Sequence, residues 1–127
     1  MAITVFWDAE NKRILRIDFE GQWSWANYDK AVDEAAALIR EVHNNVTVIF
    51  NLLHGPDIPH EIASSHLLRS LRLIPQNATS LFVVGASPLA EAILVPFFRS
   101  TFRLSGRKIT TSSRLEGVYA GVAKQGL

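Results

Sequence analysis

One stretch of the sequence decides the fold: Val46-Thr47-Val48-Ile49-Phe50-Asn51-Leu52-Leu53. It is a near-continuous run of apolar and β-branched residues, which is typical of a strand buried on both faces of a sheet. A polar loop with two prolines and one glycine follows at residues 54–59. In open α/β sheets, ligands and partners bind at the carboxyl ends of the strands. The sequence therefore places the functional surface at this loop.

Four further strands and four helices are predicted around the central strand. Apolar side chains at 15, 17 and 19 alternate with charges, which indicates a half-buried strand. Apolar residues spaced three and four apart predict an amphipathic helix that begins after Ser24. Pro59 and Pro88 mark two more helix starts, and Pro96 is expected to kink or split the third helix. The expected strands are 3–7, 14–19, 46–53, 80–85 and 108–111, and the expected helices are 24–42, 59–74, 88–104 and one that opens at 113.

This order, β-β-α-β-α-β-α-β-α, predicts an α/β protein with a single domain over residues 1–127. Strands that alternate with helices from residue 46 onward indicate a parallel sheet with right-handed crossovers, and the opening hairpin adds an antiparallel edge. We therefore expect a mixed five-stranded sheet with helices packed on it. Hydrophobic residues make up 48% of the 127, which is enough to build a substantial core.

Composition excludes several kinds of site. The absence of cysteine rules out disulfides, thiolate metal sites and cysteine nucleophiles. No apolar run approaches the ~18 residues of a membrane span, and the start of the chain lacks a signal layout, so we expect a cytoplasmic protein without an integral membrane segment. Residues 1–61 hold ten acids and five Lys/Arg, whereas 62–127 hold two acids and eight Lys/Arg. This asymmetry fits a bipolar surface that helps two copies meet, or a basic patch for an anionic partner.

The loop after the central strand holds the first candidate site, formed by His54, Asp57 and His60. A metal needs ligands that converge, but His60 and Glu61 are adjacent and diverge at a helix start, and the second histidine of an HExxH motif is missing. Two interpretations remain: a solvated polar loop that binds a partner, and acid–base chemistry by His54 or His60 with Asp57. We expect no metal, no cofactor and no catalytic residue.

The helix predicted at 88–104 is the second candidate, because it has more apolar side chains than one buried face needs. The surplus fits a homodimer interface, a pocket for an apolar or lipid-like ligand, or core packing alone. Nucleic acid is not an expected partner, since the N-terminal half is acidic and no recognised binding motif occurs. The candidate residues are Leu94, Phe97, Phe98 and Phe102, with Arg99 and Arg103 beside them.

The element order, the turn Gly21-Gln22-Trp23-Ser24-Trp25 and the apolar strand that ends in a polar loop resemble the STAS domains of sulfate transporters and anti-sigma factor antagonists. More narrowly, the chain is similar to bacterial STAS-like proteins grouped with the CRAL-TRIO lipid-transfer superfamily. The resemblance covers essentially the whole chain. It implies a STAS-like fold and a regulatory role in which a partner kinase is bound.

In STAS antagonists, a serine at the start of the helix after the central strand is phosphorylated, which breaks the complex with the kinase. The corresponding stretch here, 51–59, contains no serine or threonine. Ser64 and Ser65 come a turn or more into the predicted helix. We therefore expect a non-enzymatic, self-associating interaction module without the usual phosphorylatable serine. A carrier or sensor of a small apolar or lipid-like ligand is the alternative, and an enzyme that uses His54, Asp57 and His60 is the third choice.

Overall fold

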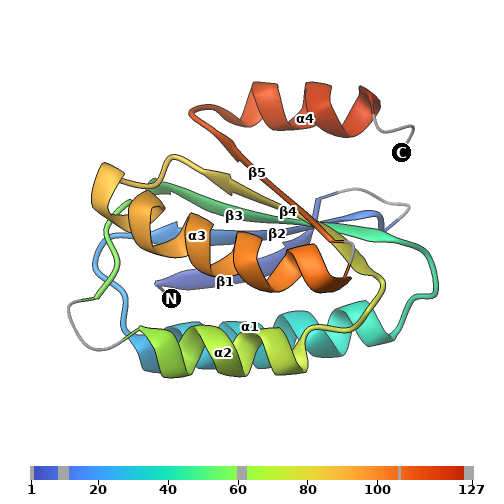
Figure 1. Cartoon of the computed structure of the whole chain (residues 1–127), viewed down its shortest axis with the longest axis horizontal. Coiled ribbons are helices and arrows are strands. Elements are labelled where there is room, and N and C mark those ends of the chain that lie inside the picture. The colour runs from blue at the N-terminus through green and yellow to red at the C-terminus, as the bar shows by residue number, and fades with distance from the viewer. Residues whose placement is uncertain (1, 9–11, 60–62, 106, 125–127) are drawn as a thin grey trace.

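Figure 1 shows the computed structural model of the chain, which describes residues 2–8, 12–59, 63–105 and 107–124. The described part contains five strands and four helices in the predicted order, so the predicted α/β class is confirmed. The elements are β1 (Ile3–Trp7), β2 (Ile14–Glu20), α1 (Trp25–Arg40), β3 (Val46–His54), α2 (Ser64–Leu73), β4 (Ala78–Val84), α3 (Pro88–Ser105), β5 (Lys108–Ser112) and α4 (Leu115–Lys124).

The five strands form one mixed sheet in the order β1-β2-β3-β4-β5. β1 is antiparallel to β2, whereas β2, β3, β4 and β5 are all parallel, as the hairpin and the later alternation predict. β3 lies in the middle, where Val48 pairs with Leu15 on one side and Leu81 on the other. Residues from Val46 to Leu52 are all buried, which confirms that this strand is covered on both faces.

Three helices share one face of the sheet. Each parallel crossover, from β2 to β3, β3 to β4 and β4 to β5, steps in the same direction, so right-handed connections place α1, α2 and α3 on the same side. In Figure 1, α1 and α2 run below the strands, α3 crosses in front of them and α4 lies on the opposite side. The main core lies between the sheet and these three helices. Its members include Leu15, Ile17, Phe19, Val32, Ile39, Val48, Phe50, Leu52, Leu67, Leu81, Val83, Ala90, Leu94 and Phe98.

The other face of the sheet is covered by α4 alone among the described helices. Val118 packs there against Ile49, Phe82 and Val84, and this forms a second and smaller core. Fully burying a side chain of this size contributes about 1.5–3 kcal/mol, and Val118, with Leu115 and Tyr119 partly buried beside it, attaches α4 to the sheet.

The predicted start of α2 needs correction, and so does the split that was one of two outcomes expected at Pro96. The described part of α2 begins at Ser64, whereas the sequence predicted a start at Pro59; residues 57–59 have no helical structure, and 60–62 lie outside the described residues. α3 continues through Pro96 without splitting. Proline removes one hydrogen bond of the helix, but Leu94 and Phe98 on either side of it are buried in the core, and their packing holds the helix together.

No helix in the described ranges combines the length and the apolar character needed to cross a membrane.

The start of α1 is fixed by a capping box, as the position of Ser24 predicts. The Ser24 hydroxyl accepts a hydrogen bond from the backbone N–H of Asn27 at 3.0 Å, and the Asn27 side chain accepts one from the Ser24 N–H at 2.9 Å. Two N–H groups that would otherwise lack partners at the helix end are therefore satisfied.

We expect Ser24→Ala to lower the free energy of unfolding by about 0.5–2 kcal/mol, because it removes the hydroxyl acceptor at the helix start. Urea unfolding followed by circular dichroism measures this change. Ser100→Ala makes the same chemical change at an exposed position inside α3 and should be neutral or slightly stabilising. Equal effects of the two substitutions would show that the capping box contributes nothing.

Candidate functional site

The loops at the carboxyl ends of the parallel strands are joined by backbone hydrogen bonds. The Gly21 N–H donates to the His54 carbonyl at 2.7 Å, which connects the loop after β2 to the end of β3. The Ser87 N–H donates to the Pro56 carbonyl at 3.0 Å, which connects the loop after β4 to the loop after β3. These loops lie on the left in Figure 1, where the helices begin. Their mutual bonding gives this end of the molecule a fixed backbone.

An aromatic cluster lies under these loops and adds to their rigidity. The Trp23 indole N–H donates to the Gly55 carbonyl at 3.3 Å, and the Trp23 ring lies 4.9 Å from Phe19 and 5.3 Å from Trp25. A Cβ at Gly55 would lie 3.0 Å from backbone atoms of Phe19 and Gly21, so the loop packs tightly against the end of β2. Trp23 and Trp25 are both buried and belong to the main core.

The predicted loop residues lie on this rigid end and face the solvent. His54 is the last residue of β3, and His54 and Asp57 are both exposed. Neither side chain makes a hydrogen bond or ion pair within the described ranges. His60 lies outside the described residues, so the structure does not place it beside the other two. An exposed imidazole and an exposed carboxylate can contact a partner, but they lack the desolvated surroundings that tune groups for acid–base chemistry.

Metal ligands do not converge in the part of the chain that the structure describes, where no group of three or more His, Asp or Glu side chains could hold an ion.

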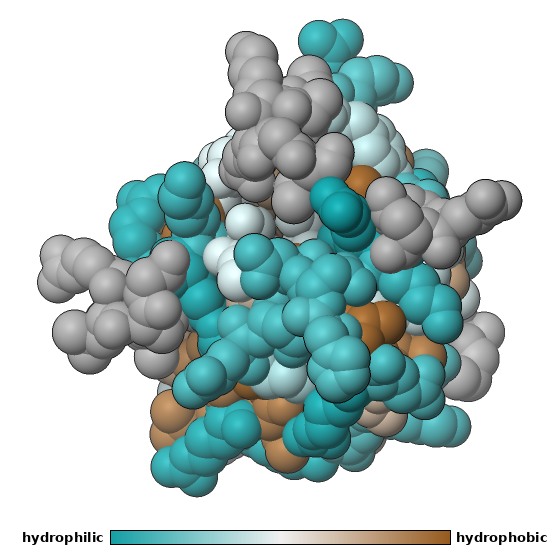
Figure 2. All heavy atoms as spheres, turned by 90° about the vertical axis from the view of Figure 1, so that its right-hand side faces the viewer, coloured by the Kyte–Doolittle hydropathy of each residue, from teal (hydrophilic) through white to brown (hydrophobic). Residues whose placement is uncertain are grey.

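Exposed apolar side chains accompany the polar ones. Leu53 is 38% exposed at the end of β3, and Leu89 is 67% exposed in the first turn of α3. Figure 2 shows the opposite end of the molecule, where hydrophilic residues cover most of the described surface. We call Leu53, His54, Asp57 and Leu89 together the carboxyl-end surface. The mixture of apolar and polar groups on a fixed backbone is typical of a binding surface.

The structure divides the candidate residues on α3 between the core and the surface. Leu94 and Phe98 are 3% and 0% exposed and belong to the main core, so for these two residues the structure agrees with core packing and not with a dimer surface. Phe97 is half-buried, and Arg99 is exposed. The side chains of Phe102 and Arg103 lie outside the described ones. Much of the apolar surplus is therefore needed to cover the sheet.

A groove runs along the outer side of α3, on residues that are not among the predicted site residues. Its volume is about 470 Å³, and we call it the α3 groove. Its floor consists of small apolar residues, and its rim carries one carboxylate. The lining residues are Ala86, Pro88, Glu91, Ala92, Val95 and Pro96.

Ser64 and Ser65 are exposed and are the first two residues of α2 as described. The sequence placed them a turn or more into the helix, and the later helix start corrects that position. The described first turn of α2 has no acidic residue, so its positive dipole end has no acidic side chain of its own to offset it.

A polar cluster between α1 and α2 was not predicted. His66 Nδ1 lies 2.9 Å from Asp29 Oδ2, and the His66 ring stacks on the Trp25 indole at 5.3 Å with an interplanar angle of 6°. Arg69 donates to Asp33 at 2.7 Å. These contacts hold α2 on α1. Their only sequence signal is the acidic pair at 29 and 33, one turn apart, which α2 matches with a histidine and an arginine.

A second polar network crosses the face of the sheet that α4 covers. Arg16 donates to both carboxylate oxygens of Asp18, at 2.7 and 3.0 Å, and the Asn51 amide donates to Asp18 at 3.0 Å. Tyr119 of α4 hydrogen-bonds to Asp8. The hydrogen bond from Arg16 to Asp18 raises the pKa of Arg16, although partial burial acts in the opposite direction. The charged groups of this network pair with one another, so we interpret the network as a stabilising feature of the fold and not as a binding site.

Comparison of the chain with family models, with curated proteins and with solved structures finds no match in any of the three.

Gly85 lies where the carboxyl-end surface is packed most tightly. Its φ is +73°, and a Cβ there would lie 2.5 Å from Leu53 Cδ2 and 2.9 Å from Leu53 Cα. Gly21 has a similar φ of +60°, but a Cβ there would meet nothing within 4 Å. The two glycines therefore separate the cost of the backbone conformation from the cost of the close approach.

We expect Gly21→Ala to cost about 1 kcal/mol of unfolding free energy, which is the penalty for a left-handed backbone at a residue with a Cβ. Gly85→Ala should cost at least about 1 kcal/mol more, because it also displaces Leu53. Urea unfolding of both variants measures the difference. Equal costs would mean that the contact between Leu53 and Gly85 is loose.

Tyr28 connects α1 to α2 from inside the core. Its hydroxyl donates to Ser70 Oγ at 2.8 Å, and Ser70 in turn donates to the Leu67 carbonyl at 2.6 Å. Burial raises the pKa of Tyr28 above its ordinary value, because the ionised form would lose its hydration. In the folded protein Tyr28 therefore stays neutral at pH values where the unfolded chain ionises.

This difference predicts alkaline destabilisation. Above about pH 10 the unfolded state loses a proton that folded Tyr28 keeps, so stability falls by about 1.4 kcal/mol per pH unit from this residue alone. We expect Tyr28→Phe to cost about 0.5–1.5 kcal/mol at pH 7 and to show a shallower loss between about pH 10 and 11.5. Urea unfolding across that range tests this, and identical slopes for both proteins would contradict it.

Proposed function

We propose that the protein is a non-enzymatic regulatory module of STAS-like type that binds a protein partner through the carboxyl-end surface and self-associates in the cytoplasm. The observation that carries this proposal is the exposure of Leu53 and His54 at the end of β3, Asp57 in the loop after it and Leu89 at the start of α3, where backbone hydrogen bonds join the neighbouring loops. A preorganised surface loses less entropy when a partner binds, which favours recognition.

The position of the surface also supports a binding role. Its elements are the ends of β3 and the start of α3, where parallel sheets usually bind their ligands. The histidine and carboxylate at this end are solvent-facing and separate, and catalytic pairs require a geometry within hydrogen-bond reach. Acid–base chemistry by His54 and Asp57 is therefore the weaker interpretation, and contact with a partner is the stronger one.

The resemblance to STAS domains adds a question about phosphorylation. The stretch 51–59 has no acceptor, but Ser64 and Ser65 are exposed at the described start of α2. A phosphate there would place about two negative charges at a helix N-terminus on the same end as the carboxyl-end surface. Mass spectrometry after incubation with a serine kinase should find residues 51–59 unmodified, and modification of Ser64 or Ser65 would restore the family's switch at a shifted position.

A carrier of a small apolar or lipid-like ligand is the second candidate, favoured by the apolar floor of the α3 groove. Ligand sites usually bury most of the ligand surface, whereas this groove lies on the outer side of one helix. Native mass spectrometry of freshly purified protein separates the two functions. A co-purifying lipid would favour the carrier, and its absence would leave the interaction module.

The proposed partner surface is tested by a triple variant, His54→Ala/Asp57→Ala/Leu89→Asp. An aspartate at position 89 lies in the first turn of α3, where a negative charge suits the helix dipole, so folding should be kept. We expect a partner captured by the wild-type protein from an extract of the source organism to fall at least about tenfold with this variant, because it removes the apolar anchor and both polar contacts.

Glu41→Ala/His43→Ala is the matched control, since both residues are exposed after the end of α1, away from the carboxyl-end surface. It should capture the partner as well as the wild-type protein does. Quantitative mass spectrometry of the captured proteins measures both variants. Equal retention by the triple variant would reject the carboxyl-end surface as the binding site.

A further inference from the structure

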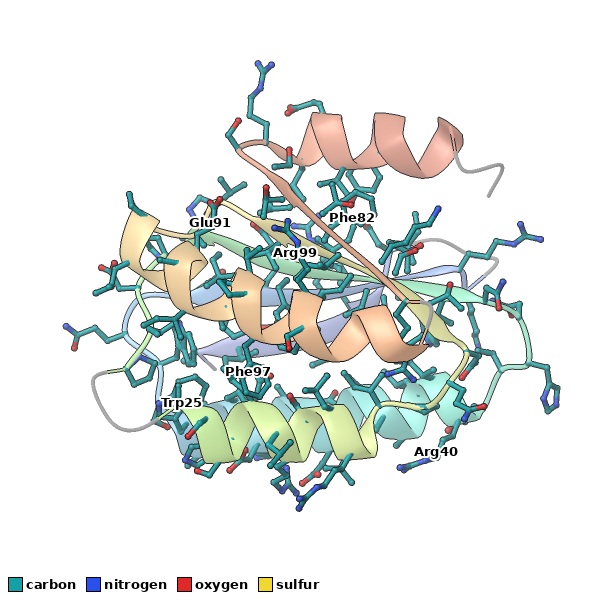
Figure 3. The ribbon with its side chains drawn as sticks, in the orientation of Figure 1. Trp25, Arg40, Phe82, Glu91, Phe97 and Arg99 are labelled. Carbon is teal, nitrogen blue, oxygen red and sulfur yellow. The ribbon has the colours of Figure 1, made fainter. Side chains whose placement is uncertain are left out.

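The α3 groove lies on the side of α3 that is turned toward β5. Figure 3 labels Glu91 near the start of α3 and Arg99 farther along the helix, where the ribbon of β5 passes close to the Arg99 label in this view. Ala92, Val95 and Pro96 line the groove between them, and such short side chains let another backbone approach closely. β5 is at the edge of the sheet and pairs with β4 alone among the described strands, so no further strand of the described chain adjoins this side of the groove.

Glu91 is one of the residues that line the α3 groove, and Arg99 lies on the same helix just beyond the lining. Glu91 lies four residues before Val95, and Arg99 lies four residues after it. Both side chains are exposed, and neither forms an ion pair or side-chain hydrogen bond with another described residue. About 12 Å of helix axis separates them, so they do not pair with each other within one chain.

We propose that the occupant of the α3 groove is the α3 helix of a second copy of this chain, antiparallel and related by a two-fold axis near Val95. This arrangement deepens the self-association in the proposed function and rests on it. In a two-fold contact, if residue i of the first copy touches residue j of the second, then residue j of the first copy also touches residue i of the second. Glu91 of each copy then meets Arg99 of the other, so the contact between the two α3 helices contains two ion pairs.

Pro96 gives the arriving arginine a second acceptor. Proline has no N–H, so it cannot donate to the carbonyl of Ala92 four residues earlier, and Ala92 is one of the residues that line the groove. Ala92 is adjacent to Glu91 in the chain. A guanidinium has several N–H donors in one plane, so Arg99 of the second copy can donate to the Glu91 carboxylate and the Ala92 carbonyl together.

The arrangement makes an unusual prediction about charge reversal. Glu91→Arg places an arginine opposite Arg99 of the other copy, and Arg99→Glu places a glutamate opposite Glu91. Each variant alone has two repelling contacts, so its dimer dissociation constant should rise at least about tenfold. In an equimolar mixture, the heterodimer regains two attractive contacts. The mixture should dimerise about as tightly as the wild-type protein, and so should the double variant Glu91→Arg/Arg99→Glu.

Sedimentation equilibrium at micromolar concentrations measures these dissociation constants, and circular dichroism shows that each variant is folded. The control mixture is Glu34→Arg with Arg72→Glu, which pairs the same net charges at exposed positions on α1 and α2. It should dimerise no better than either component. If the control mixture dimerised more tightly than either of its components, net charge alone would explain the association, and the proposal would be overturned.

Two further outcomes separate this inference from the proposed function. If the wild-type protein dimerises but the charge reversals at 91 and 99 leave its dissociation constant unchanged, self-association stands and the α3 contact is wrong. If the wild-type protein is monomeric up to about 100 μM, both the self-association and the α3 contact are wrong. Partner binding at the carboxyl-end surface is measured separately and survives either result.

Discussion

The burial of β3 on both faces is the constraint on which the rest of the structure depends. Its side chains from Val46 to Leu52 are removed from water, and its backbone groups then need partners within the protein. β2 and β4 provide those partners by parallel pairing on the two sides. The side chains need a covering layer on each face, which α1, α2 and α3 provide on one face and α4 on the other.

The two layers are unequal because every crossover steps in the same direction across the sheet. Three helices share one face, and α4 has only ten residues to cover the other. It packs on Ile49, Phe82 and Val84, whereas β2 presents Arg16 and Asp18 on that face. These two pair with each other, and Asn51 of β3 donates to Asp18. The polar network thus pairs the polar side chains on the part of this face that α4 does not cover, so no second helix is needed there.

The sequence predicted the cap at Ser24 and the order of the elements, because caps and periodicity depend on neighbours within a few residues. The strand directions then followed from the alternation of strands and helices. It placed the start of α2 too early, because Pro59 is equally suited to an extended loop. It could not divide the apolar residues of α3 between core and surface, since that depends on how the helix is rotated against the sheet. The cluster of Trp25, Asp29 and His66 joins positions 37 residues apart, and no local pattern reports such a contact.

Because every crossover steps in the same direction, the helix layer also has open sides at which a second molecule can bind. A layer of three helices has two end members, and each has one side without a helical neighbour in that layer. On α1 the exposed charged residue Glu34 lies away from the contact with α2 and suits water. The open side of α3 instead joins a small-residue groove to one acid and one base placed symmetrically about Val95. In the proposed dimer, an antiparallel copy would cover the apolar floor of this side and pair both charges at once.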